Sequence, residues 1–214
     1  MKKLTRPLVI YFFVFIAWSI YRYLVPNSGN WIDNFLGKPI IWLLPTFFVV
    51  KVIEKKKLAS IGLIKNHFFK YCIFGIGVGI AFFLYVKLLD VFIHHTTLQL
   101  LPHLDFFAIG SFLAFGLATG IVEEILFRGY LQTRLTAAFK SSVWGVIVSS
   151  LLFALMHIPV SIFVYHYSLS RLLTYEIYLF EVGILFSVLF LFTKTLTLPI
   201  VAHGVLDFLS DLVT

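Results

Sequence analysis

The pattern of hydrophobic and polar positions divides the chain into long apolar runs separated by short polar segments. Each run comes close to the roughly 20 residues that an α-helix needs to cross a bilayer. None shows the ten-residue alternation that is typical of an outer-membrane β-barrel. The pattern therefore predicts transmembrane helices at about 8–25, 39–53, 68–92, 105–127, 142–160, 175–193 and 196–212.

Two features leave the number of spans open. The second run is short and contains Pro45, so we expect it to tilt, kink or extend into its flanks. A re-entrant or interfacial piece could lie in 158–172 or in 129–140. The predicted fold class is an all-α, polytopic transmembrane helical bundle of about seven to eight spans.

Composition supports a membrane protein and excludes other classes. Of the 214 residues, 60% are hydrophobic and 13% are charged, against roughly 45–50% and about 25% in soluble domains. The 18% of aromatic residues exclude a disordered chain, and the single Cys72 excludes a disulfide scaffold. No long polar linker or repeat interrupts the sequence, so we expect one integral-membrane domain over 1–214.

The net charge of +7 comes from basic residues that lie between the apolar runs. This distribution favours contact with membrane lipid over nucleic-acid binding. With seven alternating spans and a cytoplasmic N-terminus, thirteen of the 17 Lys and Arg lie on the cytoplasmic side, and four, including Lys38, lie opposite. We therefore expect a multi-pass protein of the cell membrane whose N-terminus is cytoplasmic.

Ionisable residues within the predicted helices are candidates for function, because a charge in hydrocarbon is expensive. In the segment GIVEEILFRGYLQ, Glu124 and Arg128 lie four residues apart. Residues at this spacing share one helical face, so the two side chains can pair. Glu123 then points about 100° away from Glu124 around the helix axis and is available for a second task. The three motifs are GIVEEILFRGYLQ with Glu123, Glu124 and Arg128, FALMHIP with Phe153 and His157, and LPIVAHGVLDFLSD with His203 and Asp207.

Helix geometry allows these side chains to meet in one layer. If 140–141 forms a cytoplasmic turn between unbroken helices, Glu123 and His157 both lie roughly 24–26 Å from it. His203 and Asp207 lie roughly 14–20 Å along their own helix. Such residues in apolar helices are hard to explain as packing, since each would lower stability without a partner.

A carboxylate and two imidazoles are the groups needed to activate water, and the residues leave two routes open. In one, Zn²⁺ activates the water, held by ligands among Glu123, His157, His203 and Asp207. In the other, Glu123 is a general base towards a water shared with His157, and His203 stabilises the oxyanion. No cofactor is assigned beyond this candidate Zn²⁺. The sequence contains neither HExxH nor GxSxG, which argues against a zincin and a serine mechanism.

The three motifs together resemble the CPBP family of intramembrane proteases (CAAX protease and bacteriocin-processing, also called Abi). The family pattern is E-E-x-x-x-R, then F-x-x-x-H, then H-x-x-x-D/N, on separate membrane helices. The chain is similar to the type II CAAX prenyl endopeptidases, which carry Asn where this chain has Asp207. The motif-bearing protease core is about 105–212.

This resemblance implies an endopeptidase, either metal-dependent or glutamate-dependent, that acts on a membrane-associated, prenylated or leader-bearing peptide or a lipidated protein. It implies that Glu123 and His157 position and deprotonate the water, and that His203 and residue 207 stabilise the tetrahedral intermediate. Because an ionised Asp cannot donate a hydrogen bond to an oxyanion, Asp207 must be protonated, orient His203 or bind a metal. The supporting residues would be Glu124, Arg128 and Phe153.

Two other functions compete with the protease. One is a non-enzymatic bacteriocin-immunity or regulatory membrane protein that retains the fold. The other is a small transporter with a proton relay, which predicts inverted repeats that the sequence does not show. The complete set of motif residues favours the enzyme. The sequence leaves the substrate, the biological role and the oligomeric state open.

Overall fold

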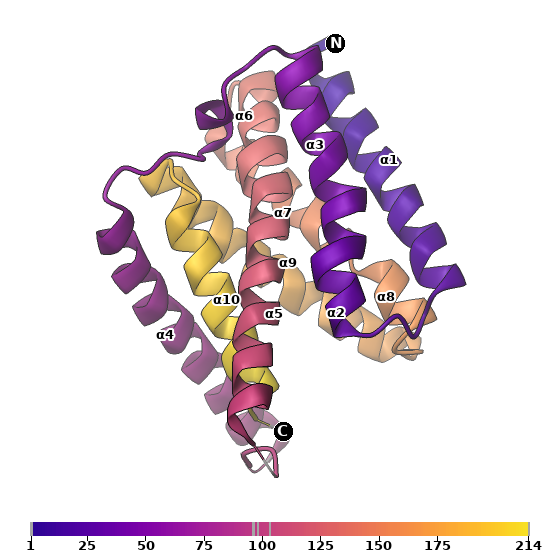
Figure 1. Ribbon diagram of the computed structural model, residues 1–214, viewed down its shortest axis with the longest axis vertical. Coiled ribbons are helices and arrows are strands. Elements are labelled where there is room, and N and C mark those ends of the chain that lie inside the picture. Colours follow the sequence, from indigo (N-terminus) through magenta and orange to yellow (C-terminus); the bar gives the residue numbers. More distant parts are fainter. Residues whose placement is uncertain (1, 96, 98, 103, 214) are drawn as a thin grey trace. The chain divides into compact units, whose positions relative to one another are not determined.

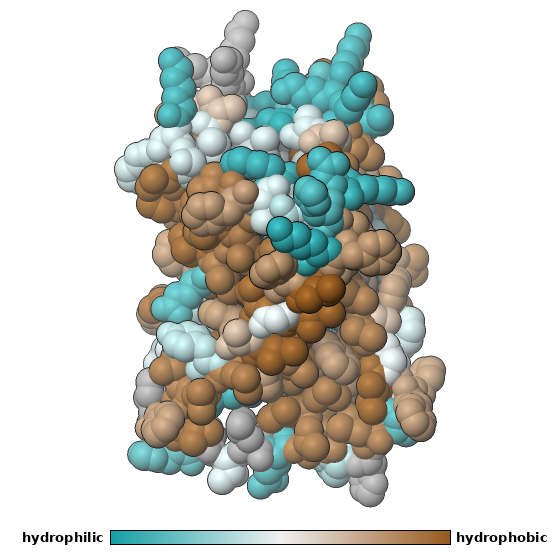
Figure 2. Space-filling view, turned by 90° about the vertical axis from the view of Figure 1, so that its left-hand side faces the viewer, coloured by the Kyte–Doolittle hydropathy of each residue, from teal (hydrophilic) through white to brown (hydrophobic). Residues whose placement is uncertain are grey.

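The computed structural model describes residues 2–95, 97, 99–102 and 104–213, and the regular elements of this part of the chain are helices (Figure 1). Hydrophobic side chains cover most of the face drawn in Figure 2. Six helices are long and apolar enough to cross a membrane, namely Leu4–Leu24, Asn30–Ile53, Phe68–Leu89, Phe106–Phe139, Ser142–Phe163 and Leu169–Thr193. The prediction of an all-α, multi-pass membrane protein is confirmed.

The seventh predicted span is shorter than the others. It corresponds to α10 (Thr197–Asp211). The 15 residues of this helix are fewer than the roughly 20 that a helix needs to cross a bilayer. The helices form two compact units. Unit 1 comprises Met1–Ile64 and Val122–Leu196, and unit 2 comprises Lys65–Ile121 and Thr197–Thr214. The single-domain organisation stays a prediction.

The second span of unit 1 begins at Asn30, nine residues before the predicted start. The side chain of Asp33 explains the early start, because it binds Arg22 at 2.5 Å and accepts a hydrogen bond from the Tyr21 hydroxyl at 2.7 Å. These contacts join α1 (Lys2–Leu24) to a stretch that the sequence pattern assigns to a polar loop. The span consists of α2 (Asn30–Ile32), η1 (Asp33–Gly37), η2 (Pro39–Leu43), α3 (Leu44–Phe48) and η3 (Val49–Ile53).

The motif-bearing helix continues well past its predicted end at 127. It consists of α5 (Phe106–Glu124), the π-helical η5 (Ile125–Gln132) and α6 (Thr133–Phe139). The segment 129–140 is therefore the end of a long helix and not a re-entrant piece. The predicted turn at 140–141 is confirmed, because Lys140 has a positive φ of 53° and Ser141 caps the next helix.

The helix that follows is interrupted at His157. α7 (Ser142–Leu155) ends two residues earlier, and α8 (Ile158–Phe163) begins one residue later. The assumption of an unbroken helix up to 160 is wrong, because Pro159 has no N–H and its ring would clash with the carbonyl of Leu155. In the interval 158–172, α8 is followed by a short connection over residues 164–168, and α9 (Leu169–Thr193) then begins.

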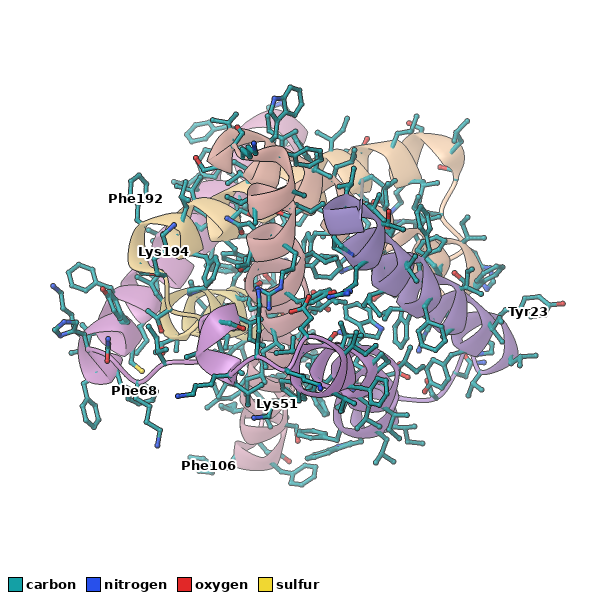
Figure 3. The ribbon with its side chains drawn as sticks, turned by 90° about the horizontal axis from the view of Figure 1, so that it is seen from above. Tyr23, Lys51, Phe68, Phe106, Phe192 and Lys194 are labelled. Atoms are coloured by element: carbon teal, nitrogen blue, oxygen red, sulfur yellow. The ribbon has the colours of Figure 1, made fainter. Side chains whose placement is uncertain are left out.

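The core of unit 1 forms where α7 and α9 pack against each other and against η5. Gly183 of α9 lets the helices approach closely, since a Cβ there would lie 2.9 Å from that of Ser150. Gln132 donates to the Ser187 carbonyl at 2.9 Å, which ties η5 to α9. Side chains on the outside, such as Tyr23 of α1 and Phe192 of α9, point away from the helices (Figure 3).

Unit 2 is held together by glycines that bring its helices close to α10. α10 lies beside α4 (Phe68–His94) (Figure 1). A Cβ at Gly79 of α4 would lie 2.7 Å from the carbonyl oxygen of Ala202. Close contact between small residues is a common basis of helix association in membranes, where lipid offers no hydrophobic driving force.

Replacing Gly79 with Val should destabilise unit 2. The new side chain would clash with the backbone of α10, and overpacking of this kind costs about 1–3 kcal/mol. Gly77→Val is the matched control on the same helix, because nothing lies within 4 Å of a Cβ at Gly77. Thermal unfolding in detergent should show a lower midpoint for Gly79→Val alone. Equal midpoints for the two variants would contradict this packing.

Candidate active site

Glu123 lies in the last turn of α5, directly before the π-helical η5. Its side chain is only 2% exposed, and its Oε2 atom lies 3.8 Å from Nε2 of His157. This distance is too long for a hydrogen bond between the two side chains. The structure thus brings two of the predicted catalytic residues together, with a narrow gap between a carboxylate oxygen and an imidazole nitrogen.

The break between α7 and α8 determines how the imidazole of His157 points. Its Nδ1 atom lies 3.0 Å from the carbonyl oxygen of Phe153, and the Phe153 ring meets the imidazole edge-on at 4.9 Å. A carbonyl oxygen only accepts hydrogen bonds, so Nδ1 carries the proton. In the neutral ring, Nε2 then presents a lone pair towards Glu123.

Lys38 is a residue of this site that the sequence analysis missed. Its Nζ atom lies 2.9 Å from Oε1 of Glu123, 85 positions away in the sequence. The charge pattern assigns Lys38 to a loop on the outer side, whereas the structure places it inside the second span, between η1 and η2. Lys38 lies four residues from both Asn34 and Trp42, a spacing that would place the three side chains on one helical face. The sequence indicates this shared face only if the helix is known to start at Asn30.

Glu124 and Arg128 form the predicted ion pair at 2.8 Å, with both side chains fully buried. Arg128 also donates to the carbonyl of Gly183 on α9 at 3.2 Å. Its guanidinium lies 4.3 Å from the centre of the Phe153 ring on α7. The arginine therefore ties the end of α5 to two neighbouring helices, and its geometry suits a structural role.

His203 and Asp207 belong to α10 of unit 2, where Nε2 of the imidazole lies 3.5 Å from Oδ2 of the carboxylate. Glycines of α5 fix both positions, because a Cβ at Gly120 would lie 3.4 Å from that of His203. A Cβ at Gly116 would lie 3.3 Å from that of Asp207. The predicted meeting of this pair with Glu123 and His157 in one layer stays a prediction.

The cation next to Glu123 bears on the candidate metal site. In the described part of the chain, no group of three or more His, Cys, Asp or Glu is arranged to hold one. The ammonium of Lys38 already binds Oε1 of Glu123, and it would repel a divalent cation at the same carboxylate. A catalytic zinc site needs three protein ligands, and unit 1 contains two of the four candidate ligands, Glu123 and His157. The candidate Zn²⁺ stays a prediction.

The fold and the site define a class: a multi-pass helical membrane protein with a carboxylate and an imidazole that face each other in its interior. Residues 105–209, about half of the chain, match the family described as type II CAAX prenyl endopeptidase Rce1-like. The match confirms the resemblance that the three motifs carry, and the matched family is one of proteases. No curated protein and no solved structure matches the chain.

Removing the arginine of the buried pair should destabilise the protein strongly. In Arg128→Met, Glu124 loses its ion pair in a fully buried position, and breaking such a pair costs about 3–5 kcal/mol. The double variant Glu124→Leu, Arg128→Met removes both charges and should recover most of the loss. Unfolding midpoints in detergent measure both effects. A single variant as stable as the wild type would contradict the structural role.

Proposed function

We propose that this protein is an intramembrane endopeptidase that cleaves a membrane-associated peptide with a water molecule activated by Glu123 and His157, without a metal ion. The observation that carries the proposal is the gap of 3.8 Å between Glu123 Oε2 and His157 Nε2. The family match at 105–209 supports proteolysis as the reaction.

The gap has the chemistry of a water site. A carboxylate oxygen and an unprotonated imidazole nitrogen are both acceptors, so they favour a donor between them. A water molecule can donate one hydrogen bond of about 2.8 Å to each. Both of its hydrogens are then engaged, and a lone pair on its oxygen is directed towards an incoming carbonyl.

The reaction follows from these positions. The water oxygen attacks the carbonyl carbon of the scissile bond, and Glu123 takes the proton that the water loses. Glu123 then transfers this proton to the amide nitrogen as the carbon–nitrogen bond breaks, which yields an amine and a carboxylic acid whose hydroxyl keeps the second hydrogen of the water. Glu123 is buried and the His157 side chain is only partly exposed, which limits the access of bulk water to the reacting groups.

We include His203 and Asp207 in the proposal because they match the family motif H-x-x-x-D/N. Their distance from Glu123 is not part of the argument. His203 would donate a hydrogen bond to the oxyanion of the tetrahedral intermediate. The 3.5 Å contact between His203 Nε2 and Asp207 Oδ2 supports orientation of the imidazole as the task of Asp207. This role agrees with an ionised Asp at the position where the prenyl endopeptidases carry Asn.

The substrate class follows from the membrane setting and from the family description. A peptide that reaches this site must itself be bound to the bilayer, and a prenyl group on a C-terminal CaaX cysteine provides such an anchor. We propose a prenylated or otherwise lipid-anchored peptide as substrate. A fluorogenic, farnesylated CaaX peptide and its unprenylated counterpart are therefore suitable probes in proteoliposomes.

Glu123→Gln should abolish cleavage while leaving the fold intact. The amide keeps the shape of the side chain but cannot accept the proton, and loss of a general base lowers kcat about 10²–10⁴-fold. Glu181→Gln is the matched control, since Glu181 is an exposed carboxylate at the middle of α9. Full activity of Glu123→Gln on the farnesylated peptide would refute the proposed mechanism.

Chelators should not inhibit the purified enzyme. If Lys38, rather than a metal ion, is the cation bound to Glu123, cleavage should be unchanged after incubation with EDTA or 1,10-phenanthroline. Elemental analysis of the active protein should find far less than one zinc per chain. Loss of activity with chelator and its return with added Zn²⁺ would show that the metal route operates instead.

A further inference from the structure

We infer that Lys38 is a positioning residue for Glu123, one that binds Oε1 and so leaves Oε2 directed at His157 and at the attacking water. The inference deepens the proposed function and rests on it. The two oxygens of a carboxylate are chemically equivalent until a neighbour distinguishes them. Here Lys38 Nζ lies 2.9 Å from one oxygen, and His157 Nε2 lies 3.8 Å from the other.

Lys38 is not an ordinary interfacial lysine. It is the ninth of the 24 residues of the span Asn30–Ile53 and so lies two turns or more from both ends of the helix. A lysine near a helix end usually extends its ammonium to the membrane surface. The side chain of Lys38 is instead only 15% exposed and points inward to a carboxylate that is 2% exposed. A largely buried charge within a membrane-spanning helix is expensive and indicates a function.

The wide turns of this span bring Lys38 into its buried face. Residues four apart turn by about 40° per step in an α-helix, so a stripe at that spacing would drift around the helix. The π-helical η1 and η2 contain wider turns, which counteract the drift. Asn34, Trp42 and Thr46 form one straight buried stripe that includes the mostly buried Lys38, and another stripe is exposed, with Leu36, Ile40, Leu44 and Phe48.

Close packing holds the backbone and the stem of Lys38 in place. A Cβ at the adjacent Gly37 would lie 3.1 Å from the Tyr21 hydroxyl oxygen, so α1 contacts the span directly at this level. The ammonium lies 5.9 Å from the centre of the Trp42 ring. That ring packs edge-on against Phe127 of η5 at 5.9 Å. Lys38 is thus fixed relative to the helix that carries Glu123.

The inferred role gives the N-terminal part of the chain a share in catalysis. Lys38 lies outside the segment 105–209 that matches the protease family. A site assembled from that segment alone would lack the cation on Glu123 Oε1. In this protein the second span therefore completes the orientation of the carboxylate.

Kinetics of Lys38→Met test the role. With the farnesylated CaaX peptide in proteoliposomes, we expect kcat to fall at least tenfold and KM to change less than threefold. Lys38→Arg, which retains a cation, should recover a large part of kcat. Lys51→Met is the control, because Lys51 is an exposed lysine of the same span. A kcat for Lys38→Met within threefold of the wild type would overturn the inference. It would also be overturned if Lys38→Arg lost as much kcat as Lys38→Met and both variants had a lowered unfolding midpoint.

A cross-link tests the contact without relying on activity. Dicyclohexylcarbodiimide activates a buried carboxylate, and an adjacent amine then displaces dicyclohexylurea to form an amide with no spacer. Mass spectrometry of the wild type should find a peptide pair that joins Lys38 to Glu123, and Lys38→Arg should lack it. Modified Glu123 joined to no lysine would overturn the inference. If the wild type cleaves neither peptide, the proposed function fails, while the cross-link still decides the placement of Lys38.

Discussion

The structure depends on one constraint: two adjacent carboxylates, Glu123 and Glu124, are buried in a membrane helix, where an ionised group is costly without a partner. The chain meets this constraint with two different cations. Arg128 comes from the same helix and binds Glu124, whereas Lys38 comes from the second span and binds Glu123. The two carboxylates consequently have different tasks. Glu124 is fixed in a structural pair, and one oxygen of Glu123 remains directed at His157.

Irregular helix geometry is what brings these partners together. η5 begins directly after Glu124, and all eight of its residues are buried. The span that carries Lys38 contains π-helical turns on both sides of it, and the helix that carries His157 is interrupted at that residue. Such departures from regular α-helix are frequent at functional sites. Each of the three side chains in this part of the site thus lies at or beside a departure from regular α-helix.

Local relationships could be predicted from the sequence, and long-range ones could not. The Glu124–Arg128 pair and the Phe153–His157 contact follow from a spacing of four on one helix. The break before Pro159 could also have been foreseen, because proline disrupts a helix in a known way. Lys38 could not, since its contact with Glu123 spans 85 positions and depends on a helix that starts early because Asp33 binds Arg22. The same limit applies to the length of the motif-bearing helix, whose extension to Phe139 is stabilised by contacts such as Arg134 with Glu54.

The central claim is that water attacks the peptide bond directly, without a covalent intermediate on the enzyme. Cleavage of the farnesylated peptide in H₂¹⁸O with hydroxylamine present tests it most directly. The account predicts that the new carboxylate contains one ¹⁸O and that no peptide hydroxamate forms. Formation of the hydroxamate would show that an acyl-enzyme is trapped, and it would contradict the account.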